Sequence, residues 1–339
     1  MSTWKLAAHP SWPKFSVAFL LFATFYLLAR EAFPHSGKYH DLLSTIDRDA
    51  LIAHPHTSRL VRTLEGNERR YQFTIGEREK LITKTGARQI AAFPPPRTQF
   101  YVLWDFFIPA FTCPFPMYRV GTLADGGKWV CGLDRVLHNR RRPIVYSLGY
   151  QTPAYSSFEQ DILQRSPELK IYGFDSNSTA IGAAHWPWGE DNVQHDTQLA
   201  SRVHFNTYSF GDLKATKYRS MQSVMKSLGH DFVDILKVDL EGDEFATMAS
   251  IIADSGSAPL PFGQLLLEVH IGWSDDMTTV DHFAKWWERL EAAGLRPFYF
   301  EVSMMDVNNL RAEPAVVYWS LINVRGRHAL VDDSLPEFP

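Results

Sequence analysis

From residue 143 onward, short aliphatic runs alternate with amphipathic segments, and this alternation constrains the fold more than any other feature of the sequence. Short aliphatic runs are typical of strands that are buried on both faces of a sheet. Five such runs lie at residues 144–148, 170–174, 202–208, 233–240 and 264–270. Because helix-sized segments separate most of them, we expect parallel strands with covering helices.

Two more aliphatic runs, 296–302 and 315–324, follow with no helix-sized pattern between them. A short connection joins antiparallel neighbours, because a parallel pair needs a long crossover. The sequence therefore predicts an α/β fold with a mostly parallel sheet and an antiparallel last strand.

The helices are predicted from apolar spacing and from signals at their ends. Residues 221–228 carry apolar side chains at helical spacing, and residues 245–252 and 280–290 carry similar stripes. Ser156, followed three residues later by Glu159, is the signature of a capping box at the start of a further helix. These segments fit the helices that cover a parallel sheet.

Residues 15–29 form an uncharged and mostly apolar run between Lys14 and Arg30. As a helix the run would cover about 22 Å, which is short of a bilayer core of about 30 Å. It fits a signal-peptide core, a short signal anchor whose flanks complete the span, or a buried helix. An anchor is favoured, because the small residues that cleavage requires are poorly placed beyond the run.

Three regions follow from these signals. We expect a short hydrophobic signal anchor at residues 1–30, a stem and helical preamble at 31–96 with helical patches at 42–52 and 77–83, and the catalytic domain at 97–339. The slight excess of positive charge before the anchor favours a cytoplasmic N-terminus. This arrangement predicts a single-pass type II membrane protein with a domain in the lumen of the endoplasmic reticulum or Golgi. Cleavage would give a secreted form instead.

The formal net charge is -4, without long runs of one sign, so no basic surface indicates a nucleic-acid partner.

Cys113 and Cys131 are the only cysteines, too few for an all-cysteine zinc site, and no histidine pair at ligand spacing lies beside them. We therefore expect no metal for the leading function given below. In an oxidising lumen the two cysteines could form a disulfide, and otherwise they are buried free thiols.

Ligands of open α/β sheets bind at the carboxyl ends of the strands, so functional residues are expected there. Gly149 ends the first strand and allows the backbone to approach a ligand closely. It is a single glycine, and the G-x-G-x-x-G fingerprint of dinucleotide sites is missing. Asp175 ends the second strand, where it can accept hydrogen bonds from both hydroxyls of a ribose. The alternative is that Asp175 caps a helix.

The fourth strand carries charged side chains although we expect it to be buried, which is costly unless the charges are paired or functional. Asp239 lies at the carboxyl end of this strand, and Lys237 lies two residues earlier on the same face, where it could pair with Asp239. Glu268 and His270 close the fifth strand. His270 is a candidate general base for a hydroxyl, with a hydrogen-bonded structural histidine as the alternative.

Five blocks of sequence, taken in order, resemble the methyltransferase-like proteins of the Methyltransf_22 type. They are Asp125-Gly126-Gly127-Lys128-Trp129-Val130-Cys131, Val145-Tyr146-Ser147-Leu148-Gly149, Ser157-Phe158-Glu159, Tyr172-Gly173-Phe174-Asp175 and Leu236-Lys237-Val238-Asp239-Leu240-Glu241-Gly242. The last block is also similar to the FkbM sugar O-methyltransferases. The resemblance covers about residues 113–323, and the ordered set is far more specific than any one block.

This resemblance implies a three-layer Rossmann-like methyltransferase fold that binds S-adenosylmethionine. It implies Gly149 at the methionine end, Asp175 on the ribose and Asp239 near the reacting methyl. The residues expected to bind the cofactor are Ser147, Gly149, Glu159, Asp175, Ser176 and Asp239. The residues expected to be catalytic are Asp239, His270 and Glu268.

The N/D-P-P-aromatic motif of amino-group methylation is absent after the fourth strand. This absence favours O-methylation of a hydroxyl or carboxyl acceptor, either a small molecule or a glycan, and the FkbM likeness fits a glycan. The runner-up is a membrane-anchored lumenal glycosyltransferase in which Asp239 and Glu241 hold a divalent metal on a sugar-nucleotide diphosphate. A third alternative is a catalytically silent scaffold that keeps the fold and binds a partner.

Overall fold

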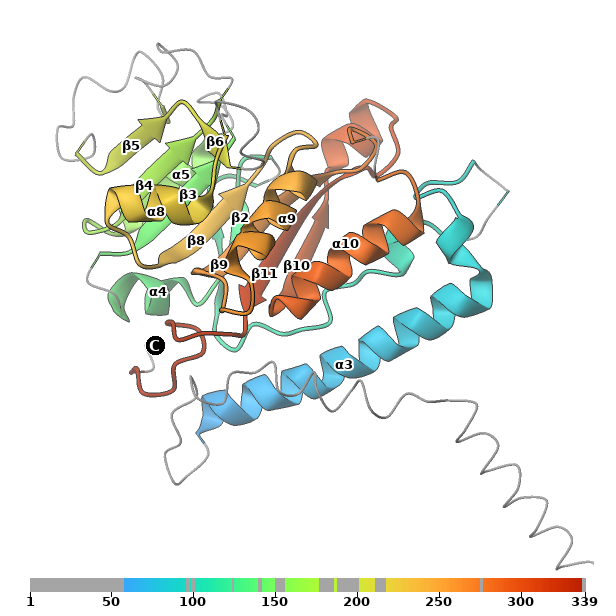
Figure 1. Ribbon diagram of the computed structural model, residues 1–339, viewed down its shortest axis with the longest axis horizontal. Helices are drawn as coiled ribbons and strands as arrows, with labels where there is room; N and C mark the ends of the chain where they lie inside the picture. Colours follow the sequence, from blue (N-terminus) through green and yellow to red (C-terminus); the bar gives the residue numbers. More distant parts are fainter. Residues whose placement is uncertain are drawn as a thin grey trace, which may run out of the picture. The chain divides into compact units, whose positions relative to one another are not determined.

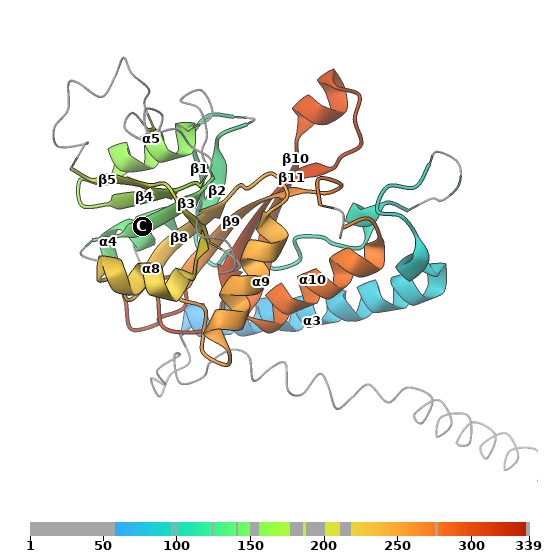
Figure 2. The same cartoon turned by 45° about the horizontal axis from the view of Figure 1, so that its top comes forward.

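The computed structural model describes residues 58–95, 98, 101–123, 125–139, 142–149, 156–176, 186–187, 201–210, 218–274 and 277–336. All of them belong to one compact unit, Thr45–Pro339. A seven-stranded sheet runs through this unit with helices on both of its faces (Figures 1 and 2).

All seven predicted strands lie in this sheet. They are β3 (Ile144–Leu148), β4 (Lys170–Phe174), β5 (Val203–Asn206), β8 (Val233–Val238), β9 (Phe262–His270), β10 (Leu295–Val302) and β11 (Val316–Asn323). Their order across the sheet is β5-β4-β3-β8-β9-β11-β10. β11 is antiparallel to both β9 and β10, and the other neighbouring pairs are parallel. The prediction of a mostly parallel sheet with an antiparallel last strand is confirmed.

One face of the sheet carries the three helices expected from apolar spacing, α8 (Met221–Leu228), α9 (Glu244–Ser255) and α10 (Val280–Ala292). The other face carries α4 (Leu133–Asn139), α5 (Ser157–Arg165) and a hairpin of β1 (Met117–Val120) and β2 (Lys128–Cys131). Figure 2 shows α5 and α8 on opposite sides of the sheet. The short elements are β6 (Ser209–Phe210), β7 (Tyr218–Arg219), the 3-10 helices Ala87–Gln89 and Leu103–Asp105, and the π-helix Met305–Asn309.

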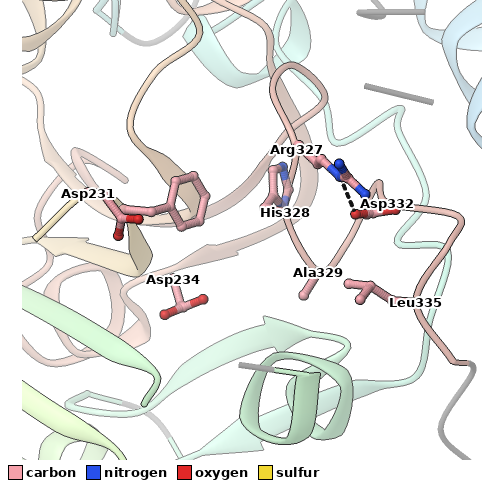
Figure 3. A pocket seen from close by; sticks show the side chains of 8 residues that line it. Asp231, Asp234, Arg327, His328, Ala329, Asp332 and Leu335 are labelled. Carbon is pink, nitrogen blue, oxygen red and sulfur yellow. Dashed lines mark hydrogen bonds and ion pairs between the residues drawn. The ribbon is translucent and has the colours of Figure 1, made fainter. Parts of the chain in front are cut away.

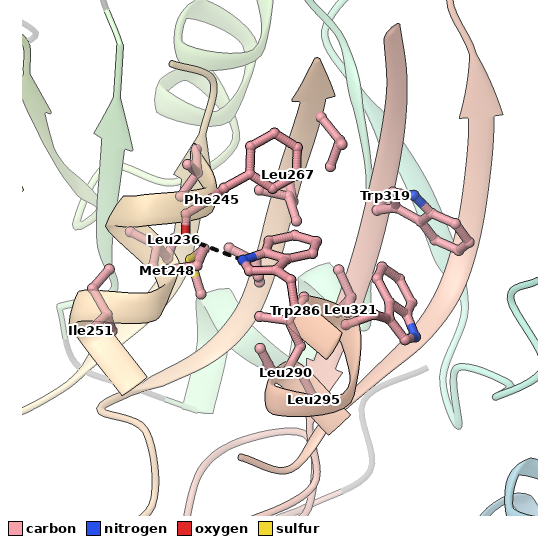
Figure 4. Close-up of a cluster of buried hydrophobic side chains, with 14 of the residues drawn as sticks. Leu236, Phe245, Met248, Ile251, Leu267, Trp286, Leu290, Leu295, Trp319 and Leu321 are labelled. Atoms are coloured by element: carbon pink, nitrogen blue, oxygen red, sulfur yellow. Dashed lines mark hydrogen bonds between the residues drawn. The ribbon is translucent and has the colours of Figure 1, made fainter. Parts of the chain in front are cut away.

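The core between the sheet and the helices α9 and α10 is built from aliphatic and aromatic side chains of both the strands and the helices (Figure 4). Leu236 and Leu267 come from the central strands, and Phe245 and Trp286 come from α9 and α10. The Trp286 indole N–H donates to the backbone oxygen of Phe245 at 3.1 Å. The large ring is therefore buried without leaving its donor unpaired.

The hairpin of β1 and β2 is fixed to the sheet through polar contacts. The Gln264 side chain of β9 exchanges two hydrogen bonds of 2.8 Å with the backbone of Cys131. Cys131 is also joined to Cys113 by a disulfide, with the Cα atoms 5.7 Å apart. Of the two states left open for the cysteines, the structure has the bonded one.

α5 begins where the sequence predicts, but the capping box is wrong. Ser156 is the N-cap residue, and its side chain makes no capping hydrogen bond. Glu159 is turned into the protein, where the Ser147 hydroxyl donates to its carboxylate at 2.7 Å. Partners distant in the sequence therefore determine the conformation of Glu159, although the local motif predicts otherwise.

The described part of the chain before the proline run, from residue 58 onward, contains the long helix α3 (Arg59–Thr85), which runs beside α10 (Figures 1 and 2). Ser58 caps its start by accepting a hydrogen bond from the Val61 backbone N–H at 3.2 Å, and Gly86 ends it at a φ of 66°. The predicted helical patch at residues 77–83 is the last part of this helix.

Charged side chains on the inner face of α3 are buried and paired. Glu68 forms a bidentate ion pair with Arg296 of β10, with N–H···O distances of 2.8 and 2.9 Å. Both side chains are 0% exposed. Arg78 forms a second bidentate pair with Glu291 of α10, at 2.8 and 2.7 Å. The domain boundary predicted at residue 96 therefore separates two segments that buried ion pairs hold together.

The predicted anchor and the predicted helical patch at residues 42–52 lie outside the described residues. Within the part of the chain that is described, no helix is both long enough and apolar enough to cross a membrane.

A pocket lies at the amino end of β8, where the chain after β11 returns to the sheet (Figure 3). It is lined by Asp231, Phe232, Asp234, Arg327, His328, Ala329, Asp332 and Leu335. His328 is buried there, with Nε2 donating to the Asn323 backbone oxygen at 2.8 Å and Nδ1 accepting from the Leu330 N–H at 3.3 Å. This pattern requires the neutral imidazole, and burial lowers the pKa of His328 to about 4.

The protein is expected to lose stability as the pH falls from about 6.5 to about 4, because the unfolded chain binds a proton that folded His328 excludes. The loss due to His328 is about 3 kcal/mol over this window and is complete below it. In His328→Gln, the free energy of unfolding measured with denaturant should depend less steeply on pH between pH 4 and 7. The control His282→Gln, which changes an exposed histidine, should keep the pH dependence of the unmodified chain. An equal pH dependence for both variants would contradict the prediction.

Candidate active site

The candidate site begins where β3 and β8 lie side by side, because the strand order changes direction between these two strands. Gly149 follows β3 at a φ of 98°, and Asp239 follows β8. A Cβ atom added to Gly149 would lie 1.7 Å from the Asp239 backbone oxygen. Only glycine allows this approach, so Gly149 fixes the position at which Asp239 leaves the sheet.

Asp175 and Ser176 lie next to this point, at the end of the neighbouring strand β4. The Gly149 N–H donates to the Phe174 backbone oxygen at 2.9 Å, which places Asp175 one residue beyond the contact. The Asp175 N–H donates to the Asn206 oxygen at 3.0 Å, and the side chain stays partly exposed. Asp175 is therefore open to a ligand at the carboxyl edge of the sheet.

Ser147 and Glu159, two further residues predicted to bind the cofactor, are buried beneath this edge. Glu159 is 1% exposed, and besides the Ser147 hydroxyl it contacts Lys237, whose Nζ lies 3.0 Å from Glu159 Oε1. Lys237 is itself 0% exposed. The buried ion pair between α5 and β8 holds the strand directly before Asp239. Glu159 is thus a support of the site in this structure.

The three residues predicted to be catalytic converge. His270 Nε2 lies 3.6 Å from Glu268 Oε1 and 4.0 Å from Asp239 Oδ1. One ligand atom from each residue lies within 4.8 Å of the other two, and all three residues are buried. The strand-end argument therefore identifies side chains that share one site, although Asp239 and His270 are 31 positions apart in the sequence.

Two residues that the sequence did not single out surround this cluster. Lys128 of β2 donates to Glu268 Oε2 at 2.8 Å, and its Nζ lies 4.2 Å from the centre of the Tyr318 ring. Glu244 of α9 accepts hydrogen bonds of 2.7 Å from the backbone N–H groups of His270 and Gly242. Lys128 lies within one of the resembling blocks, but its partner is 140 positions away, so spacing alone could not reveal the pair.

The cluster shifts the protonation of its members. Burial and the Glu268 carboxylate raise the pKa of Asp239 to about 8. Burial opposes ionisation of Glu268 too, but the Lys128 ammonium and His270 hold its pKa well below the usual range. Burial lowers the pKa of His270, yet the Glu244 and Glu268 carboxylates outweigh it and raise the pKa to about 10.

These shifts distinguish the candidate bases. With a pKa near 10, His270 is an imidazolium at neutral pH, so it has no lone pair to accept a proton. Glu268 is held ionised by its cationic neighbours and is a weak base. Asp239, with its pKa near 8, binds a proton most readily of the two carboxylates.

The strand order, the single reversed strand and the ligand edge at β3 and β8 together define a Rossmann-like methyltransferase fold. The chain belongs to the Methyltransf_22 family, whose model, described as a methyltransferase domain, matches residues 93–313. None of the curated proteins matches this chain.

Several solved methyltransferase structures are similar to the chain. The METTL16 methyltransferase domain matches with a TM-score of 0.34 and 11% identity over 57% of this chain and 65% of that one. A human methyltransferase 10 domain containing protein matches with a TM-score of 0.34 and 10% identity, over 57% of this chain and 79% of that one. This chain thus spans just under two thirds of the first structure, and likeness at this level carries no information about the acceptor.

Proposed function

We propose that this protein transfers a methyl group from S-adenosylmethionine to an oxygen of a hydroxyl or carboxyl acceptor. The observation that carries the proposal is the arrangement at the carboxyl edge of the sheet. A glycine turn, a partly exposed Asp175 and the cluster of Asp239, Glu268 and His270 lie along neighbouring strand ends. A ligand with a ribose at one end and a sulfonium at the other fits this order.

In the proposed reaction an acceptor oxygen forms a bond to the methyl carbon while the carbon–sulfur bond breaks. The bonding pair stays on sulfur, which becomes the neutral thioether of S-adenosylhomocysteine. A hydroxyl acceptor loses its proton to Asp239, whereas an ionised carboxyl needs no base. Catalysis rests chiefly on alignment of the sulfonium and the acceptor, which the rigid strand ends provide.

The glycosyltransferase alternative requires Asp239 and Glu241 to hold one metal ion together. Asp239 is 7% exposed, whereas Glu241 is exposed and adopts a φ of 51° in the turn before α9. Asp239 lies instead in one cluster with Glu268 and His270. This arrangement favours methyl transfer over the alternative.

We also propose that the domain faces an oxidising lumen behind an anchor formed by residues 15–29. The disulfide between Cys113 and Cys131 supports this placement, because disulfides persist in secretory compartments and are rare in the cytosol. A glycan or a small molecule with free hydroxyl or carboxyl groups is then the acceptor available to it. Alkylation of both cysteines before reduction, in protein taken directly from cells, would contradict the lumenal placement.

Replacing Asp175 by Ala is expected to weaken S-adenosylmethionine binding by about 1–3 kcal/mol, because a charge-assisted hydrogen bond to the ribose is lost. Calorimetric titration of the folded variant measures this change. Asp254→Ala, which removes an exposed carboxylate on α9, should bind like the unmodified chain. Unchanged affinity in Asp175→Ala would refute the ribose contact.

The proposed function is tested by release of S-adenosylhomocysteine. The full chain is incubated with S-adenosylmethionine and, in separate reactions, with pools of glycans, hydroxylated small molecules and carboxylic acids. Acceptor-dependent release supports methyl transfer, and the pool that gives it identifies the acceptor class. If S-adenosylmethionine binds but no pool yields product, the chain behaves as the silent scaffold.

A further inference from the structure

The strongest unexplained feature is the way in which the side chains around His270 are held. His270 Nε2 points toward Glu268 Oε1 and Asp239 Oδ1, but the distances of 3.6 and 4.0 Å are longer than hydrogen bonds. The His270 side chain is 5% exposed. A buried nitrogen that faces two carboxylate oxygens beyond hydrogen-bond distance leaves room for a small cation between them.

The separations match a metal site. Two ligand atoms of one cation lie about 3–4 Å apart when each metal–ligand bond is about 2.0–2.3 Å long. Two of the three separations here are 3.6 and 4.0 Å, and none exceeds 4.8 Å. Small side-chain movements would bring all three atoms to bonding distance of one ion.

Glu244 and Lys128 supply the outer contacts that metal ligands usually have. Glu244 Oε1 lies 3.4 Å from His270 Nδ1 and is itself fixed by two backbone N–H groups. This is an ion-pair distance without a hydrogen bond, and it places a carboxylate beside the far nitrogen, where histidine ligands of metals usually have one. Lys128 holds Glu268 Oε2, which leaves Oε1 directed at the cluster. Both ligand side chains are thus oriented from outside the cluster.

The charges around the cluster also accommodate a cation. Asp239, Glu268 and Glu244 bring three carboxyl groups, and Lys128 and protonated His270 bring the positive charges. The nearby Glu159 carboxylate is already paired with Lys237. A divalent cation that replaces the protons of His270 and Asp239 keeps the buried carboxylates neutralised.

We propose that Asp239 Oδ1, Glu268 Oε1 and His270 Nε2 bind one divalent cation of the Mn²⁺ or Zn²⁺ class, which takes the place of the proton on His270 Nε2. One imidazole nitrogen with two carboxylate oxygens suits these ions better than Mg²⁺, which prefers oxygen ligands alone. The three residues leave coordination positions open for an acceptor oxygen. This role rests on the proposed methyl transfer, in which the cation would orient that oxygen and favour loss of its proton.

Metal binding is measured without any substrate. The full chain is stripped with EDTA, dialysed and titrated with Mn²⁺, and the electron paramagnetic resonance signal reports the free ion. We expect about one ion per chain, with binding weakened at least tenfold in Glu268→Gln and in His270→Asn. The control Asp243→Asn changes an exposed carboxylate four residues from Asp239 and should bind like the unmodified chain. Near-ultraviolet circular dichroism establishes that each variant is folded.

The outcomes separate this proposal from the proposed function. Saturable binding that Glu268→Gln loses and Asp243→Asn keeps supports the site. Absence of binding for both Mn²⁺ and Zn²⁺, or binding that folded Glu268→Gln retains, overturns it and makes the cluster an ion pair neutralised by protonated His270. S-adenosylmethionine is titrated separately into the stripped chain. If it binds there, the methyltransferase proposal stands whatever the metal result, and if only the metal binds, the metal site stands alone.

Discussion

In Glu68→Gln, the free energy of unfolding is expected to fall by about 3–5 kcal/mol, because Arg296 keeps its charge in a buried position without its anionic partner. The Arg296 guanidinium is 0% exposed and donates two hydrogen bonds to Glu68. The amide of Gln has one acceptor oxygen in place of the two carboxylate oxygens, and it carries no charge. Denaturant unfolding at neutral pH measures the change.

Glu77→Gln is the matched control, since it makes the same substitution on the same helix. Glu77 pairs with Lys80 at 2.7 Å, but both side chains are at least half exposed. Exposed pairs contribute about 0–1 kcal/mol, so this variant should unfold nearly like the unmodified chain. If Glu68→Gln were equally mild, α3 would not be held to the sheet by its buried charges. A shortened chain that begins after residue 96 would then keep its stability.

Asp239→Asn is expected to lower the rate of methyl transfer by about 10²–10⁴-fold, because it removes the base that takes the proton of the acceptor. The affinity for S-adenosylmethionine should fall much less, since alignment and proton removal act mainly in the transition state. His270→Ala should lower the rate less than Asp239→Asn, because in the proposed reaction the proton is taken by Asp239 and not by His270. Steady-state kinetics and calorimetry on the same preparations separate the two effects.

Asp243→Asn is again the control variant, because Asp243 is exposed and lies in the turn that follows Asp239. Asn caps helices as well as Asp, so the start of α9 should be unchanged. It should retain the normal rate. A folded Asp239→Asn that transfers methyl as fast as this control would remove Asp239 from the reaction. Glu268 would then be the remaining carboxylate at the site.

The sheet could be predicted because strands of a buried parallel sheet consist mostly of consecutive aliphatic residues. β4 has the predicted bounds, and β8 ends two residues before the predicted end, directly before the charged turn at Asp239. The edge strand β5 is shorter than its run, as expected for a strand that is only partly buried. Strand ends then identified Asp239, Glu268 and His270 through topology alone.

α3 was underestimated because its inner face contains polar residues. Asn67, Glu68, Gln72 and Arg78 are buried there, so the apolar period of the helix is interrupted. The partners of Glu68 and Arg78, Arg296 and Glu291, lie more than 200 residues away. A single sequence carries no signal for such pairs.

The supporting residues of the candidate site were missed for a similar reason. Lys128 lies in a glycine-rich hairpin whose strands are only four residues long, and its role depends on Glu268 across the sheet. Glu159 matched a local capping motif, but Ser147 and Lys237 attract its carboxylate instead. Local patterns cannot show which of two polar partners a side chain will choose once the chain is folded.

Calorimetric titration of S-adenosylmethionine into the full chain tests the central claim most directly, since it requires neither an acceptor nor a metal. We expect saturable binding of one molecule per chain, binding of S-adenosylhomocysteine at the same site, and weaker binding by Asp175→Ala. A folded chain that binds neither compound, yet binds a UDP-sugar in the presence of Mn²⁺, would contradict the account and favour the glycosyltransferase alternative.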